Sequence, residues 1–154
     1  MAMSESTQNT ANTNLYATFA VNDLYFGVEV CKVQEVLRYQ AMTRIPLAPK
    51  VLRGLINLRG QIVTAIDIRE RLRLPADPDS RMPMSMIVRT SEGAVSFLVD
   101  EIGEVIDLNA ATFEPCPETL DRGLKEVIDG VHKLDGRLLL VLNTDRTLAL
   151  PEAA

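Results

Sequence analysis

The chain has 154 residues, of which 47% are hydrophobic and 24% charged, and it carries a formal net charge of −5. These are the proportions of a globular domain, and the negative charge argues against nucleic acid or an anionic membrane as the main partner. No apolar run approaches the ~20 residues of a membrane-spanning helix. The two cysteines, Cys31 and Cys116, form neither a metal-ligand spacing nor a disulfide framework, so a reducing cytoplasm is the simplest setting.

The N-terminal part predicts an arm followed by a hairpin. Residues 1–14 are polar and carry neither the basic start nor the apolar stretch of a secretory signal, so we expect a flexible arm. Apolar and polar residues then alternate on both sides of the turn-forming pair Asn22-Asp23, which predicts a β-hairpin ending near Val30. A short helix is predicted next, because three apolar residues share one helical face: Val33, Val36 and Leu37.

Proline and glycine divide the rest of the first half into short elements. Two prolines within residues 46–49 exclude a continued helix or a central strand and indicate a rigid connection. Residues 54–68 predict two strands joined by the turn Arg59-Gly60, and residues 69–74 a single helical turn. The polar segment 76–83 indicates a linker.

The second half follows the same plan. A hairpin is predicted over residues 84–100, with its turn at residues 90–93, and another over residues 131–142. Asp135-Gly136 predicts a type I′ turn in the second hairpin, which requires a positive φ at both residues. Residues 138–142 are apolar throughout, so this strand is expected to be buried on both faces.

The two halves repeat one pattern. Residues 54–72 overlay residues 130–148 at an offset of 76, and residues 28–36 overlay residues 97–105 at an offset of 69. The matched positions include two pairs of glycines: Gly54 with Gly130, and Gly60 with Gly136. The seven-residue difference places an insertion within residues 116–129. Many short strands in two copies predict two small barrels, and because each copy alone buries little surface, we expect a shared core.

Several blocks together resemble the signature of the CheW family of chemotaxis coupling proteins. They are Asn57-Leu58-Arg59-Gly60, the following Asp67-Ile68-Arg69, and Tyr25-Phe26-Gly27-Val28 leading into residues 32–36. The resemblance covers residues 15–150. It implies an all-β fold of two SH3-like five-stranded β-barrels in pseudo-repeat, with a shared core and one or two short helices. The single CheW-like domain is expected to divide near residue 80, with barrel 1 over residues 15–80, barrel 2 over residues 84–150 and strand exchange possible.

The resemblance also implies a function. Members of the family are non-catalytic adaptors that join the cytoplasmic tip of a methyl-accepting chemoreceptor to the regulatory domain of a CheA-type histidine kinase. It therefore implies no enzymatic activity, cofactor, metal, nucleic acid or direct membrane contact, in a cytoplasmic protein recruited to membrane-associated receptor arrays. A scaffold in a non-flagellar chemosensory pathway remains an alternative, and the kinase-contacting residues are not specified.

The family's receptor-binding surface falls on seven positions of this chain: Val33, Glu35, Val36, Gly54, Asn57, Arg59 and Gly60. Each position also has a purely structural interpretation. Arg59 is a solvated turn charge, Asn57 a cross-link of the turn, and the glycines are backbone requirements. The two valines are core between the barrels. Glu35 recurs as Glu104 in the repeat, which favours a structural hydrogen bond common to both.

Two other classes of function compete with this interpretation. The single histidine, His132, is expected to be a partly buried structural residue, and a Cys31–His132 nucleophilic pair lacks any orienting or oxyanion motif. Residues 53–73 contain five arginines, which suggests a nucleic-acid-binding barrel. The absence of Trp and the 5% aromatic content argue against base stacking.

Overall fold

The computed structural model describes residues 15–75, 77, 79, 82–108 and 112–149. The expected arm over residues 1–14 lies outside these ranges, and the expected linker over residues 76–83 lies partly outside them. The first half of the described chain forms the following elements: β1 (Leu15–Val21), β2 (Leu24–Glu29), the 3₁₀ turn η1 (Val30–Lys32), β3 (Val33–Leu37), β4 (Leu52–Leu58), β5 (Gln61–Asp67) and α2 (Ile68–Arg71). The second half forms β6 (Met84–Thr90), β7 (Gly93–Val99), β8 (Glu101–Asp107), β9 (Phe113–Glu114), α3 (Arg122–Lys125), β10 (Ile128–Leu134), β11 (Arg137–Leu142) and α4 (Thr144–Leu148).

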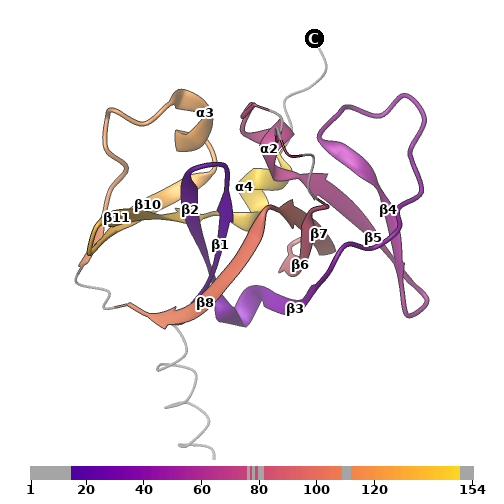
Figure 1. Ribbon diagram of the computed structural model, residues 1–154, viewed down its shortest axis with the longest axis horizontal. Helices are drawn as coiled ribbons and strands as arrows, with labels where there is room; N and C mark the ends of the chain where they lie inside the picture. Colours follow the sequence, from indigo (N-terminus) through magenta and orange to yellow (C-terminus); the bar gives the residue numbers. More distant parts are fainter. Residues whose placement is uncertain (1–14, 76, 78, 80–81, 109–111, 150–154) are drawn as a thin grey trace, which may run out of the picture.

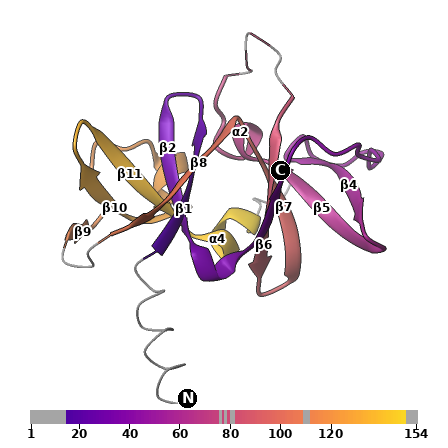
Figure 2. The same cartoon turned by 60° about the horizontal axis from the view of Figure 1, so that its bottom comes forward.

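The strands form two sheets that lie side by side. Barrel A has the strand order β8-β1-β2-β11-β10-β9, and barrel B has the order β3-β6-β7-β5-β4. Figures 1 and 2 show the two barrels with α4 between them. The expected all-β architecture is confirmed. The two-residue strand β9 adds a sixth strand to barrel A, and the described residues hold three short α-helices where one or two were expected.

Neither barrel is built from one half of the chain. The hairpin β1–β2 of the first half pairs with β8 and with β11, which come from the second half. Likewise, the hairpin β6–β7 of the second half pairs with β3 and β5 of the first. The boundaries drawn at residues 15–80 and 84–150 therefore do not delimit the barrels, since the two copies exchange their first hairpins.

Matched residues of the two copies make the same hydrogen bonds. Asp67 and Asn143 each cap a short helix, accepting from the backbone N–H of the residue three positions later, and so satisfy a donor of the first helical turn. The backbone N–H of Asp67 donates to Val51 at 2.8 Å, and that of Asn143 to Val127 at 2.7 Å. These paired contacts show that the predicted duplication extends to three dimensions.

One core joins the two barrels. Phe19 and Phe26 of barrel A are fully buried and stack with their ring centroids 5.2 Å apart. They belong to the same apolar cluster as Phe97 and Met86 of barrel B. This continuous cluster confirms the expected shared core, and it means that either barrel alone would expose apolar surface to water.

The predicted helix over residues 33–37 is wrong. This segment is the strand β3, which pairs with β6 in antiparallel register, for example Val36 with Met86. Only the short 3₁₀ turn η1 precedes it. The spacing of three apolar residues fits one face of a helical turn, but pairing with the edge of barrel B outweighs that weak local preference.

The hairpin over β10 and β11 forms as predicted, but its turn differs. Only Gly136 has a positive φ (81°), whereas Asp135 does not, so the type I′ geometry predicted for this pair is absent. That geometry occurs instead at Arg59-Gly60, where φ is 51° and 86°. The strand β11 is buried on both faces over residues 139–142, as expected, with Leu138 partly exposed.

Candidate functional site

Arg59 lies at the tip of the β4–β5 hairpin. Leu58 pairs with Gln61, which leaves Arg59 and Gly60 as the two central residues of the turn. The side chain of Arg59 is 69% exposed. Arg59 has a positive φ, which is uncommon for a residue other than glycine and costs a small amount of conformational energy. At this cost the turn presents the guanidinium group to solvent.

Glu35 holds this guanidinium in place. The Nη2 group of Arg59 donates to Oε2 of Glu35, whose side chain is 23% exposed and projects from β3. The ion pair links β3, one edge strand of barrel B, to the turn that follows β4, the other edge strand. Glu104, the counterpart of Glu35 in the repeat, is exposed and contributes its backbone carbonyl to Thr18 Oγ1 at 2.6 Å. The structural bond expected to be common to both glutamates is therefore not found.

Asn57 supports the same turn. Its Oδ1 accepts from the backbone N–H of Gly60 at 3.0 Å. This bond matches the structural interpretation of Asn57, because it cross-links the two ends of the turn and fixes the direction in which Arg59 points.

The two glycines of the site have different reasons to be glycine. A Cβ on Gly54 would lie 2.7 Å from the carbonyl oxygen of Thr43, which bridges to Leu55. A Cβ on Gly60 would meet nothing within 4 Å, and only its φ of 86° favours glycine. Gly54 thus permits a close approach of two backbone segments, while Gly60 permits the turn.

The two valines of the predicted site differ in burial. Val33 is partly buried and packs against the main core, as the structural interpretation had it, whereas Val36 is 39% exposed. The structure also identifies Ile62, which was missed in the sequence. It is 60% exposed and pairs across the hairpin with Asn57. Successive side chains of a strand point to opposite faces, so Ile62 points outward because its neighbour Val63 is buried. The alternation of residues in the sequence of β5 could have predicted this exposure.

His132 is almost fully buried, where a partly buried structural residue was expected. It is 1% exposed on β10, its Nδ1 lies 2.8 Å from Thr112 Oγ1, and its ring contacts those of Tyr16 and Phe113 edge-to-face. Burial lowers the pKa of the imidazole because the charged form is poorly solvated there. The partner of Nδ1 is thus Thr112, which gives the proposed pair with the exposed Cys31 no support.

The arginines of residues 53–73 do not form one cationic face. Arg53 pairs with Asp67 at 2.6 Å, Arg59 pairs with Glu35, and Arg69 pairs with Asp100 at 2.5 Å. Three of the five charges are thereby neutralised by carboxylates, which removes the main feature that favoured a nucleic-acid-binding barrel. Among the described residues no helix is long and apolar enough to cross a membrane, and no three side chains are grouped as metal ligands would be.

The chain is similar to known proteins over most of its length. The family model of the CheW-like domain matches residues 15–152. The chemotaxis protein CheW of Klebsiella aerogenes is 27% identical over 139 residues, which cover 90% of this chain and 84% of the relative. The chemotaxis protein CheW of Bacillus subtilis is 29% identical over 130 residues, covering 84% and 83%.

A solved structure shows the same fold. The scaffolding protein TtCheW from Thermoanaerobacter tengcongensis superimposes with a TM-score of 0.80 at 25% sequence identity, over 90% of this chain and 94% of that one. The two-sheet fold of this chain is thus a known architecture. The family model covers well over half of the sequence, so this chain belongs to the CheW-like domain family.

Proposed function

We propose that this protein is a non-catalytic adaptor that couples chemoreceptors to a CheA-type histidine kinase. In this proposal it resides in the cytoplasm and joins membrane-associated receptor arrays through protein contacts. The relatives named chemotaxis protein CheW support the pathway, and the neighbour described as a scaffolding protein supports the role.

The observation that carries the proposal is the Arg59 turn. One Nη2 contact orients the guanidinium on Glu35, and the exposed remainder of the group keeps several N–H donors for a partner. The position is fixed by Asn57 and by the backbone of Gly60. A rigid, exposed and oriented arginine of this kind suits recognition of a partner's carboxylate or carbonyl groups, and it loses little entropy on binding.

The receptor tip would lie against this end of barrel B. Val36 and Ile62 supply exposed apolar area, and Gly54 lets the segment at Thr43 lie close against β4. A helical hairpin could pack its apolar residues there while its polar residues contact Arg59. The kinase's regulatory domain, which has a similar fold in the family, would bind at the outer ends of the barrels, so that both partners are held at once.

Charge reversal tests the role of Arg59. We expect Arg59→Glu to reduce kinase activation in a reconstituted receptor, kinase and adaptor mixture on the order of tenfold, while thermal unfolding stays nearly unchanged, since exposed ion pairs contribute little stability. Arg59→Asn is the matched variant, because Asn tolerates the positive φ and removes only the guanidinium.

The double variant Glu35→Arg/Arg59→Glu separates two explanations. It can restore the ion pair but not the cation on the turn. Continued loss of activation would support a direct contact of Arg59 with the receptor. Full recovery in the double variant, or a large loss of stability in Arg59→Asn, would show that Arg59 is structural and would contradict the proposal.

A further inference from the structure

Two arginines of the basic run and one from the insertion remain without a carboxylate partner in the described chain. They are Arg71, the last residue of α2, Arg73, two residues beyond it, and Arg122, the first residue of α3. None of the three forms an ion pair with a described residue, in contrast to Arg53, Arg59 and Arg69. Arginines without ion-pair partners are unexpected on a protein of net charge −5, and they suggest a negatively charged ligand.

Arg71 is the fixed member of the group. It is only 7% exposed, and its Nε and Nη2 groups donate to the backbone carbonyls of Thr147, Arg146 and Ala149 at 2.8 to 3.2 Å. Three neutral acceptors hold the guanidinium plane, and none of them carries a charge that would neutralise it. Its Nη1 group has no acceptor among the described residues, so a donor stays available in a rigid position.

Arg73 occupies a position that glycine would fill without strain. Its backbone N–H donates to Glu70 and that of Leu74 to Arg69, which is the pair of bonds that ends a helix in a Schellman motif. The residue in the left-handed conformation of this motif is usually glycine, and here Arg73 has φ of 58°. A strained arginine at such a point suggests that its side chain is used.

Arg122 belongs to the second half of the chain. The insertion within residues 116–129 forms α3, and Figure 1 shows α3 at the same end of the molecule as α2. Together the three arginines line a cavity of about 260 Å³, with Val51, Gly123, Glu70 and Glu126. The pKa of Arg71 reflects this crowding: burial lowers it, Glu126 raises it, and the nearby Arg73 lowers it.

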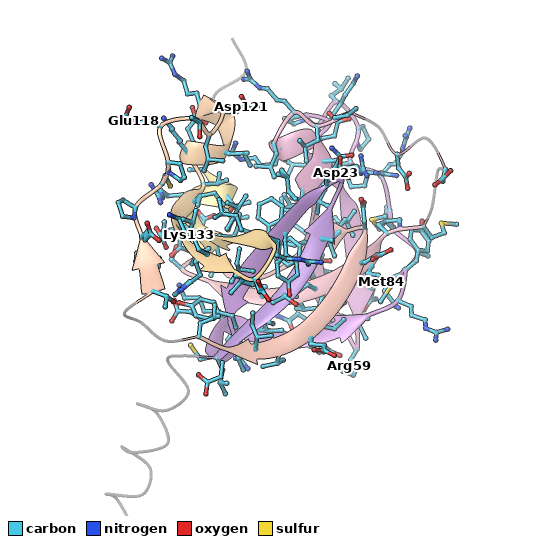
Figure 3. The ribbon with its side chains drawn as sticks, turned by 60° about the vertical axis from the view of Figure 1, so that its left-hand side comes forward. Asp23, Arg59, Met84, Glu118, Asp121 and Lys133 are labelled. Atoms are coloured by element: carbon cyan, nitrogen blue, oxygen red, sulfur yellow. The ribbon has the colours of Figure 1, made fainter. Side chains whose placement is uncertain are left out.

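We propose that the cavity between α2 and α3 binds a phosphoryl group, held by Arg71, Arg73 and Arg122. Planar guanidinium groups pair with phosphate oxygens through parallel N–H donors, and the three guanidinium groups outnumber the two glutamates of the lining, which leaves the cavity a positive charge that favours an anion. The site is independent of the proposed partner surface, since Figure 3 shows Asp121, next to Arg122, at the opposite end of the molecule from Arg59.

An NMR titration tests the site. The probe is inorganic phosphate, added to the whole chain at neutral pH and compared with chloride at equal ionic strength, with the side-chain Nε–H signals of arginine as the readout. We expect saturable shifts of Arg71, Arg73 and Arg122 with phosphate only. N-acetyl-phosphoserine methylamide as a second probe distinguishes the sources: tighter binding would indicate a phosphorylated side chain, and equal or weaker binding free phosphate.

Two variants and a control sharpen the test. Arg73→Gly and Arg122→Ala should each weaken phosphate binding on the order of tenfold, as expected for loss of one charge-assisted bond, while Arg89→Ala on β6 should bind as the native chain does. Arg73→Gly should also raise the melting temperature by about 2–4 °C, because it relieves the positive φ. Equal shifts with chloride, or an affinity of Arg73→Gly and Arg122→Ala for phosphate equal to that of the native chain, would overturn the proposal. A lower melting temperature of Arg73→Gly would contradict the strain assigned to its backbone.

Discussion

At the scale of single residues, the molecule uses conformations that its side chains do not favour. Arg59 and Arg73 are both in the left-handed region, where glycine or asparagine would be less strained. Each presents a guanidinium group at a turn that ends a strand or a helix. Backbone strain at an exposed charged residue points to use of the side chain, since the same turn could be made at lower cost.

His132 gives the fold a dependence on pH. Burial lowers the pKa of its imidazole in the folded state, and no described residue bonds its Nε2 atom. The unfolded chain therefore binds more protons below the ordinary pKa of about 6.5, so stability is greatest above that pH and falls as the pH drops through it. We expect the free energy of unfolding to decrease between about pH 7.5 and pH 5.5, and His132→Gln to show a flatter slope over this range.

Urea unfolding at several pH values measures both slopes. His132→Gln is expected to be less stable at every pH, since it disturbs the contacts with Tyr16 and Phe113. The test therefore rests on how steeply the free energy of unfolding changes with pH, and not on its absolute value. Equal slopes for the native chain and His132→Gln would mean that groups other than this imidazole control the response.

At the scale of elements, the repeated β4–β5 and β10–β11 hairpins depend on glycine in the same two ways. Gly60 and Gly136 adopt positive φ in the turns, and Gly54 and Gly130 allow another backbone to pass within contact distance. A Cβ on Gly130 would lie 2.6 Å from the carbonyl oxygen of Glu114, much as one on Gly54 would meet Thr43. The shared requirement explains why the glycines match in the sequence.

The two glycines of the site should differ when replaced by alanine. Gly54→Ala places a methyl group against the backbone of Thr43 and is expected to lower the free energy of unfolding by about 2 kcal/mol. Gly60→Ala meets open space and should lose about 1 kcal/mol through its φ alone. Urea midpoints compare the two variants, and a larger loss in Gly60→Ala would contradict the close approach at Gly54.

Sequence patterns predicted most hairpins because a hairpin depends on residues that are close together in the sequence. Asn22-Asp23, Arg59-Gly60 and the apolar strand over residues 138–142 all lie where alternation and turn chemistry put them. The strand β3 was not predicted, because its conformation depends on β6, some 50 residues away. Of the site, the exposed Arg59 followed from its turn, whereas its partner Glu35 and the neighbouring Ile62 depend on how the strands of barrel B close.

At the scale of the whole molecule, exchange of hairpins makes the two barrels one folding unit. Arg69 after β5 bonds Asp100 through Nε at 3.0 Å and Nη2 at 2.5 Å, and Asp100 also accepts from the backbone of Asn22 at 2.8 Å. This contact joins barrel B to the β1–β2 turn of barrel A. Together with the shared core, it fixes the angle between the barrels and hence between the surfaces proposed for receptor and kinase.

The exchange predicts how the protein unfolds. We expect one cooperative thermal transition, with the calorimetric enthalpy equal to the van't Hoff enthalpy, because neither barrel can unfold without removing strands from the other. Differential scanning calorimetry measures both quantities. Two separated transitions would show that the barrels are stable alone and that the shared core contributes little.

The proposed coupling role is tested most directly by isothermal titration of this chain with the regulatory domain of a CheA-type kinase from the same organism. Calorimetry reports the stoichiometry and the affinity without a label. The account predicts a saturable 1:1 isotherm that Arg59→Glu leaves unchanged, since Arg59 belongs to the proposed receptor surface and not to the kinase surface. An absence of binding by a chain shown to be folded would contradict it.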